Sequence, residues 1–151
     1  MGVKRLLKSL LDRKVKFLVI GAWRLPAHGH ERMTRDIDIF VEPTRANARR
    51  TIAALLDVGY DSVMDVPPEI FLTKKVLLRQ YVLQADIHPF VKGVSFKDAW
   101  KRRKKTNIKG LGVFVPSLED LIIMKRAAGR KRDKLDLEVL EAIHQRVSKK
   151  A

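Results

Sequence analysis

The chain has 151 residues, of which 46% are apolar, and this length and composition predict one folded domain with a hydrophobic core. Its 32 Lys and Arg against 17 Asp and Glu give a formal net charge of +15, which favours a polyanionic partner such as nucleic acid or nucleotide phosphates. The absence of cysteine excludes disulfides, thiolate catalysis and Cys-ligated metal centres. No run approaches the roughly 20 apolar residues of a membrane span, and no secretory signal is visible, so we expect a cytoplasmic protein without membrane contact.

The first elements form a helix followed by a buried strand. Apolar residues at helical spacing predict an amphipathic helix over residues 3–13. The apolar run over 16–20 predicts a strand that ends at Gly21, and a brief helical turn is expected within 22–29.

A second strand is expected over residues 36–41, where apolar and polar side chains alternate. Asp36 and Asp38 lie on one face of this strand, together with Phe40. Thr44 is a candidate N-cap for a helix over 45–57.

The second half of the chain predicts three further strands, a short helix, a turn and two C-terminal helices. Ser117 opens the first of these helices as a capping box, and Gly129 is its expected C-cap. In chain order we expect strands within 75–83 and 83–88, a helix over 96–101, a strand over 113–115, and helices over 117–128 and 133–147 joined by a basic link at 130–132. This order predicts an α+β (mixed α/β) fold, a small mixed sheet packed by helices, in a single domain over 1–151 whose helices from about 117 to 147 pack on the core.

Three aspartates are the candidate catalytic residues. Asp36 and Asp38 share a strand face with Cα atoms about 6–7 Å apart, so their carboxylates can converge on a hard divalent cation. Asp86 lies on the polar face of the strand 83–88 and would join them if the two strands are neighbours. Two metal ions held in this way can activate a hydroxyl and stabilise a leaving phosphate oxygen.

Simpler interpretations of the same residues stay open. A lone Asp-x-Asp on a strand is commonly a solvent-exposed pair, and Asp86 is equally explained as an exposed acid on a half-buried edge strand. His88 shares the face of Asp86, but a histidine hydrogen-bonded at a strand end before Pro89 accounts for it more simply.

Four segments of the sequence resemble the nucleotidyltransferase superfamily with the polymerase-beta-like core. More narrowly, they are similar to the compact prokaryotic group that includes the AbiEii-type toxins. The likeness extends from about residue 17 to residue 140, and the segments that carry it are 17–23, 32–39, 85–88 and 125–137.

The resemblance implies a role for each matching position. Asp36, Asp38 and Asp86 would be catalytic and would hold Mg²⁺ (or Mn²⁺), and Gly21 would let a nucleoside triphosphate approach the backbone. Lys125 would contact the phosphates. Ala22 and Arg35 would lie at the nucleotide. Asp133 and Asp136 would correspond to the acidic pair in the C-terminal part of the group's pattern.

One position departs from the superfamily pattern. The superfamily commonly has Gly-Ser in the first turn, whereas this chain has Gly21-Ala22 and lacks the hydroxyl that helps to hold a phosphate. Arg35 is among the residues that can supply a replacement donor.

Two basic clusters are weaker candidates for nucleic-acid contact. Their members are Arg102, Arg103 and Lys104 in one run, and Arg130 and Arg132 in the other. A solvated loop or helix end explains them as well. Trp100 precedes the first run, and with Phe96 it is expected in the core rather than as a base-stacking platform.

The resulting functional hypothesis is a metal-dependent nucleotidyltransferase. It would move a nucleoside monophosphate from a nucleoside triphosphate to a hydroxyl, with RNA or a tRNA end favoured as acceptor by the net charge of +15, and a protein or small hydroxylated molecule left open. The alternatives are a catalytically degenerate nucleotide- or RNA-binding module, and a toxin-like component that works with an antitoxin protein.

Overall fold

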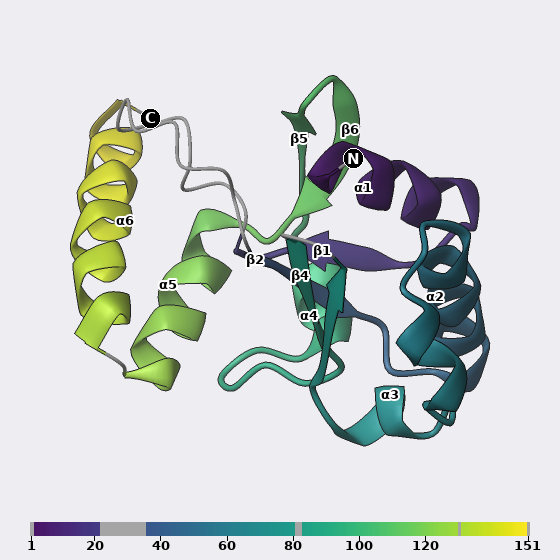
Figure 1. Cartoon of the computed structure of the whole chain (residues 1–151). Coiled ribbons are helices and arrows are strands. Elements are labelled where there is room, and N and C mark those ends of the chain that lie inside the picture. The colour runs from purple at the N-terminus through teal and green to yellow at the C-terminus, as the bar shows by residue number, and fades with distance from the viewer. Residues whose placement is uncertain (1, 22–35, 81–82, 130, 151) are drawn as a thin grey trace.

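A computed structural model describes residues 2–21, 36–80, 83–129 and 131–150, and within 131–150 it describes side chains for 137–146. Four strands form one sheet, two form a separate hairpin, and helices lie on both sides of the larger sheet (Figure 1). In chain order the elements are α1 (Val3–Asp12), β1 (Phe17–Val19), β2 (Asp36–Val41), α2 (Arg45–Asp57), the 3₁₀ helix η1 (Asp61–Asp65), α3 (Ile70–Thr73), β3 (Val76–Gln80), β4 (Leu83–His88), α4 (Phe96–Lys101), β5 (Lys104–Ile108), β6 (Leu111–Val115), α5 (Leu118–Ala128) and α6 (Lys131–Lys150).

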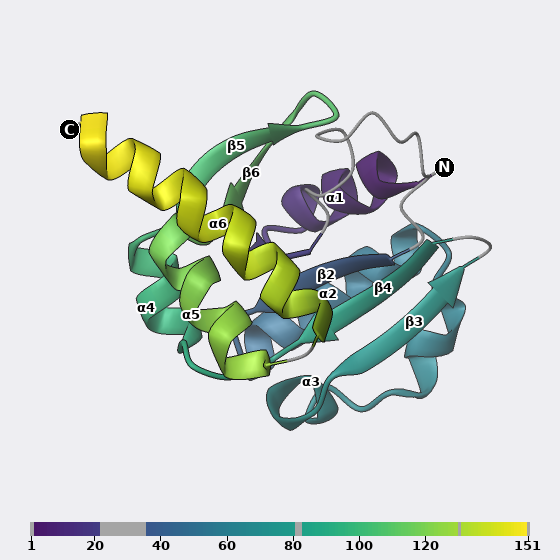
Figure 2. The ribbon, with the colours of Figure 1, turned by 90° about the vertical axis from the view of Figure 1, so that its left-hand side faces the viewer.

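The larger sheet has the strand order β1-β2-β4-β3. β2 runs antiparallel to β1 and parallel to β4, and β3 runs antiparallel to β4. Figure 2 shows β2, β4 and β3 side by side. A parallel pair requires a long crossover connection, which here includes α2. This mixed sheet packed by helices confirms the expected α+β class.

The main core lies between one face of the sheet and the helices α1 and α2 (Figure 1). Ile37 and Ile39 of β2 and Ala85 and Ile87 of β4 are fully buried on this face. Because strand side chains alternate, the residues between them point to the opposite face. The apolar half of each strand thus fixes the side on which Asp38 and Asp86 lie.

Asn47 in the first turn of α2 connects the residue before β1 to the residue after β2. Its Nδ2 donates to the carbonyl oxygens of Lys16 at 3.0 Å and Glu42 at 3.1 Å, and its Oδ1 accepts from the Lys16 N–H at 2.8 Å. Thr44 caps the same helix by accepting from the Asn47 N–H at 3.2 Å, which confirms the predicted N-cap. No local sequence pattern predicts this role of Asn47, since its partners Lys16 and Glu42 lie outside its own helix.

A second, smaller core covers part of the opposite face of the sheet. Phe40 of β2 meets Phe96 of α4 edge to face, with ring centroids 5.1 Å apart, and Phe96 stacks on Trp100 at 5.6 Å. The other buried members are Leu18, Val94, Ala99, Leu121, Ile122, Met124 and Leu140. The expectation that Phe96 and Trp100 belong to the core is confirmed. Asp36 and Asp38 precede Phe40 and are not members of this cluster.

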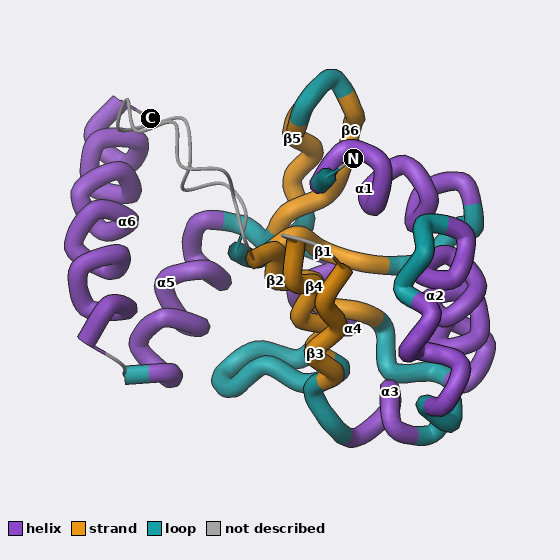
Figure 3. Tube along the Cα trace, in the orientation of Figure 1, coloured by secondary structure: helices purple, strands orange, loops and turns teal. Residues whose placement is uncertain are grey.

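The structure differs from the sequence predictions at the basic run near residue 104. A solvated loop was one interpretation, but Lys104 begins the strand β5, which pairs with β6 and has no apolar alternation to reveal it. β6 lies beside β1 and α1 (Figure 3). The short helices η1 and α3 were not predicted, and α6 begins at Lys131, so most of the expected basic link is helical.

The capping box of α5 is formed on one side. Ser117 accepts from the Asp120 N–H at 3.2 Å, and Gly129 ends the helix in the left-handed region at φ 65°, as predicted. The Asp120 carboxylate, however, pairs with Arg102. Among the described residues, no helix is long and apolar enough to cross a membrane.

Candidate active site

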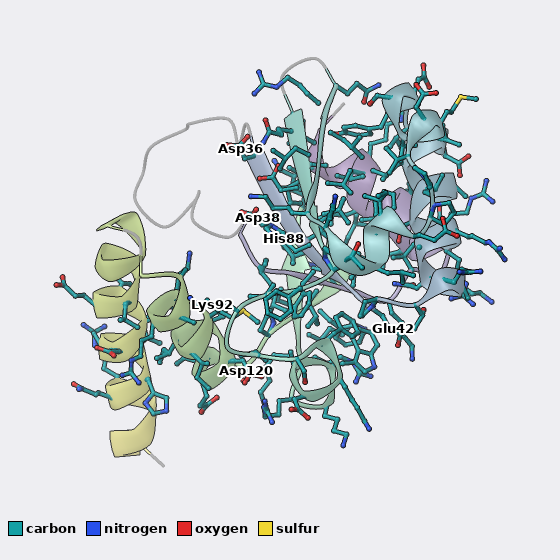
Figure 4. All side chains as sticks on the ribbon, turned by 90° about the horizontal axis from the view of Figure 1, so that it is seen from below. Asp36, Asp38, Glu42, His88, Lys92 and Asp120 are labelled. Atoms are coloured by element: carbon teal, nitrogen blue, oxygen red, sulfur yellow. The ribbon has the colours of Figure 1, made fainter. Side chains whose placement is uncertain are left out.

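The parallel pairing of β2 with β4 brings acidic residues from distant parts of the chain together. The register sets Asp38 opposite Asp86, and Phe40 opposite His88. Figure 4 shows Asp36, Asp38 and His88 near one another and away from Asp120. One ligand atom each from Asp38, Asp86 and His88 lies within 4.8 Å of the others. We call these three residues the Asp38 cluster.

Hydrogen bonds hold the side chains of the Asp38 cluster. Nε2 of His88 lies 2.9 Å from Oδ1 of Asp38. On the other side, Nε2 of Gln84 donates to Oδ1 of Asp86 at 2.8 Å, and Arg79 donates to Oε1 of Gln84 at 3.0 Å. Both carboxylates are therefore oriented by neighbours on the sheet, while all three cluster residues stay partly accessible.

Gly21 lies against the side chain of Asp38. A Cβ at this position would stand 2.2 Å from Oδ2 and 2.8 Å from Cβ of Asp38, distances that real Cβ atoms essentially never show. The Ile20 N–H donates to the Asp38 carbonyl at 2.9 Å, so the chain stays beside β2 for one residue after β1 ends. Glycine at this turn makes room for the carboxylate of Asp38.

The pKa of Asp86 is raised above its ordinary value. Burial is the largest cause, and the negative charge of Asp38 adds to it. The hydrogen bond from Gln84 opposes the rise, as do His88 and Lys75. The fold therefore disfavours the ionised form of Asp86. Perturbed pKa values of this kind are common at functional sites.

The donors of the Asp38 cluster suit a divalent cation. Two carboxylates that repel each other and an imidazole nitrogen offer three donor atoms within 4.8 Å, and a cation between them relieves the repulsion. Asp36 is exposed, faces Gln84 in the register and lies outside the group of three. The structure brings together two of the three candidate aspartates, Asp38 and Asp86. Asp36 lies two residues before Asp38, at the start of β2.

The other candidate nucleotide contacts lie elsewhere or outside the described residues. Lys125 is half-buried near the end of α5 and makes contacts within the protein. Ala22, Arg35 and Arg130 lie outside the described residues, as does the helical turn expected within 22–29. The same holds for the side chains of Arg132, Asp133 and Asp136.

Two of the basic candidates have structural partners. Arg102 forms a two-nitrogen pair with Asp120, with contacts from 2.9 to 3.2 Å, and Asp120 is only 1% exposed. The guanidinium of Arg103 lies 4.2 Å from the ring centroid of Trp100 and 4.6 Å from that of Phe114. These contacts explain both arginines without a nucleic acid. Lys104 is exposed on β5, and its contact with nucleic acid stays a prediction.

Sequence reasoning did not assign two neighbours of the candidate aspartates to the site. His88 was visible on the correct strand face, but only the pairing of β4 with β2 aims its ring at Asp38. Lys75 lies close enough to Asp86 to lower the pKa of that carboxyl, and no sequence pattern singles it out.

Comparisons with known proteins identify the fold and the family of the chain. The chain is similar to the crystal structure of the lincosamide antibiotic adenylyltransferase LnuA bound to lincomycin, with a TM-score of 0.59 and 21% sequence identity over 94% of this chain and 98% of that one. That likeness confirms the nucleotidyltransferase-like fold. No curated protein matches the chain significantly. The sequence profile of the family described as "Nucleotidyltransferase of unknown function (DUF6036)" matches residues 2–149. The chain therefore belongs to this family of nucleotidyltransferases.

Proposed function

We propose that the chain transfers a nucleoside monophosphate from a nucleoside triphosphate to a hydroxyl group, with a divalent cation held by Asp38 and Asp86. The observation that carries this proposal is the in-register meeting of the two carboxylates on adjacent parallel strands. Family membership supports the reaction class. Asp36, exposed on the same strand face, is proposed as a further cation ligand that acts once nucleotide is bound.

In the proposed reaction the acceptor oxygen attacks the α-phosphorus, and the bond from that phosphorus to the bridging oxygen of the β-phosphate breaks. Pyrophosphate leaves with the electron pair of that bond. Asp86 accepts the proton of the attacking hydroxyl. Asp38, fixed by His88 and Gly21, would hold the cation at the phosphates.

The cation, when bound, supplies charge neutralisation at the phosphates and lowers the pKa of the attacking hydroxyl. Lys125, Arg35 and the turn at Gly21 and Ala22 are proposed phosphate contacts on the strength of the superfamily resemblance. Lys75 is an additional cation close to Asp86, and its influence on the pKa of that residue supports a place near the phosphates.

Two acceptor classes have support. A small hydroxylated molecule is suggested by the similar chain length and fold of the lincosamide adenylyltransferase. An RNA end is suggested by the net charge of +15 and by exposed lysines on the hairpin of β5 and β6, namely Lys104, Lys105 and Lys109. A hydroxyl on either acceptor would use the same two carboxylates.

The test is transfer of label from each of the four α-³²P nucleoside triphosphates, with Mg²⁺ or Mn²⁺, to a tRNA pool or to a panel that includes lincomycin. We expect label in one acceptor class and release of pyrophosphate. Asp38→Ala and Asp86→Asn should lower the rate by more than about 100-fold, whereas Asp65→Asn, a change of an exposed acid on η1, should not. Equal transfer rates in the wild type and in Asp38→Ala would refute the proposed enzymatic activity.

The two alternative functions, a binding module and a toxin-like component, can be tested on the same protein preparations. A degenerate binding module would hold labelled nucleotide in equilibrium dialysis without any transfer in the assay. A toxin-like component would be inhibited by, and co-purify with, an acidic partner protein, for which the charge of +15 is the supporting observation.

A further inference from the structure

We propose that Nε2 of His88 is a third protein ligand of the cation, so that the site has mixed nitrogen and oxygen donors and selects Mn²⁺ over Mg²⁺. This inference rests on the proposed function, because it assigns a ligand to the same cation. It goes beyond three carboxylates, which the sequence resemblance alone implies.

The position of the imidazole carries the argument. β4 holds His88 two residues after Asp86 on the same strand face, and the parallel register turns it toward Asp38. Nε2 lies 2.9 Å from Oδ1 of Asp38. Its side chain is only 18% exposed, so packing limits the directions in which the ring can turn.

The contact between His88 and Asp38 has the spacing of two adjacent ligands of one cation. Ligands about 2.1 Å from a cation are about 3 Å apart when adjacent. Nε2 of His88 and Oδ1 of Asp38 are 2.9 Å apart, and the donor atom of Asp86 lies within 4.8 Å of both. Small side-chain rotations therefore suffice to seat an ion among the three residues.

The chemistry of the donors sets the preference among cations. Imidazole favours first-row transition-metal ions, Mn²⁺ least among them, whereas Mg²⁺ favours oxygen ligands and retains its water. The two carboxylates balance the charge of a divalent ion, and a neutral His88 adds a donor without adding charge. Within the described residues the hydrogen bond of this ring is at Nε2. Nδ1 is thus able to carry the ring proton while Nε2 presents its lone pair.

The competing role is orientation of Asp38 by a hydrogen bond from Nε2–H. In that case His88 never touches the cation, although its loss would still weaken binding by disordering Asp38. Affinity alone therefore does not separate a ligand from a positioning residue, and the experiment has to detect the metal–nitrogen bond.

The test is pulsed electron paramagnetic resonance of Mn²⁺ bound to the full chain, which detects a directly coordinated ¹⁴N nucleus. We expect ¹⁴N modulation in the wild type and in His144→Gln, a control on α6, and its loss in His88→Gln and His88→Asn. Titration should show Mn²⁺ binding at least about 10-fold weaker in both His88 variants, with the affinity for Mg²⁺ changed less than 3-fold.

The outcomes separate the two proposals. Mn²⁺ that binds in an Asp38-dependent manner without ¹⁴N modulation overturns the ligand role of His88 and leaves the proposed function intact. Modulation that persists in both His88 variants also overturns it, since another nitrogen is then the ligand. Absence of any Asp38-dependent cation binding, together with absence of nucleotidyl transfer, overturns the proposed function and this inference with it.

Discussion

The substitution Gly21→Ala tests whether the position of Asp38 is set by the residue after β1. The added methyl group would stand 2.8 Å from Cβ of Asp38 and 2.2 Å from Oδ2. Ordinary van der Waals contact begins near 3.4 Å. The backbone of β2 and the turn at Gly21 must therefore separate by about 0.6 Å even after the carboxylate has rotated away.

The expected effect on activity exceeds the effect on stability. Overpacking of this kind costs about 1–3 kcal/mol of folding free energy. A displacement of about 1 Å at a catalytic group lowers the rate by about 100-fold. Because the same carboxylate also contacts His88, the cation should bind more weakly as well. We expect a folded protein with a small loss of stability and a large loss of transfer.

The measurements are urea unfolding, Mn²⁺ titration and transfer of labelled nucleotide on the same preparations. Gly112→Ala is the matched control, since its Cβ would meet only the end of the Lys105 side chain, at 2.8 Å, and that exposed chain can move aside. Wild-type cation affinity and transfer in Gly21→Ala would refute the idea that this glycine exists to accommodate Asp38.

Three further predictions concern stability. Without cation, Asp86→Asn should raise the free energy of unfolding at pH 7, because the pKa of Asp86 is raised in the fold and its ionised form destabilises the fold. In urea unfolding the difference should shrink as the pH falls through the raised pKa and disappear only well below the ordinary pKa of 3.8, where the carboxyl is protonated in both states. A less stable variant at pH 7 would contradict this. Mn²⁺ at 100 times its dissociation constant should stabilise the wild type by about 2.7 kcal/mol. In a thermal melt this corresponds to a rise of about 5–10 °C in the midpoint. A similar rise in Asp38→Asn would show that the ion binds outside the Asp38 cluster. Asn47→Ala should cost about 2–4 kcal/mol in urea unfolding, because the part-buried N–H of Lys16 and carbonyl of Glu42 lose their side-chain partner. The transfer rate per folded molecule should stay unchanged, and a loss below 1 kcal/mol would show that water replaces Asn47.

The sequence by itself determined the elements and the faces of the strands around the site. Alternation within 36–41 and 83–88 assigned Asp36, Asp38 and Asp86 to polar faces, and the structure agrees, because burial of the apolar residues between them allows no other orientation. The caps at Thr44 and Ser117 were equally local, since each depends on residues within one helical turn.

Only the tertiary structure decided which of these polar residues meet. The pairing of β2 with β4 depends on a crossover of more than 40 residues, and its register sets Asp38 rather than Asp36 opposite Asp86. The same pairing aims His88 at Asp38, and the approach of Gly21 to that carboxylate depends on where β1 lies. The strand β5 and the pair of Arg102 with Asp120 also escaped prediction, because their partners are supplied by other elements rather than by a local pattern.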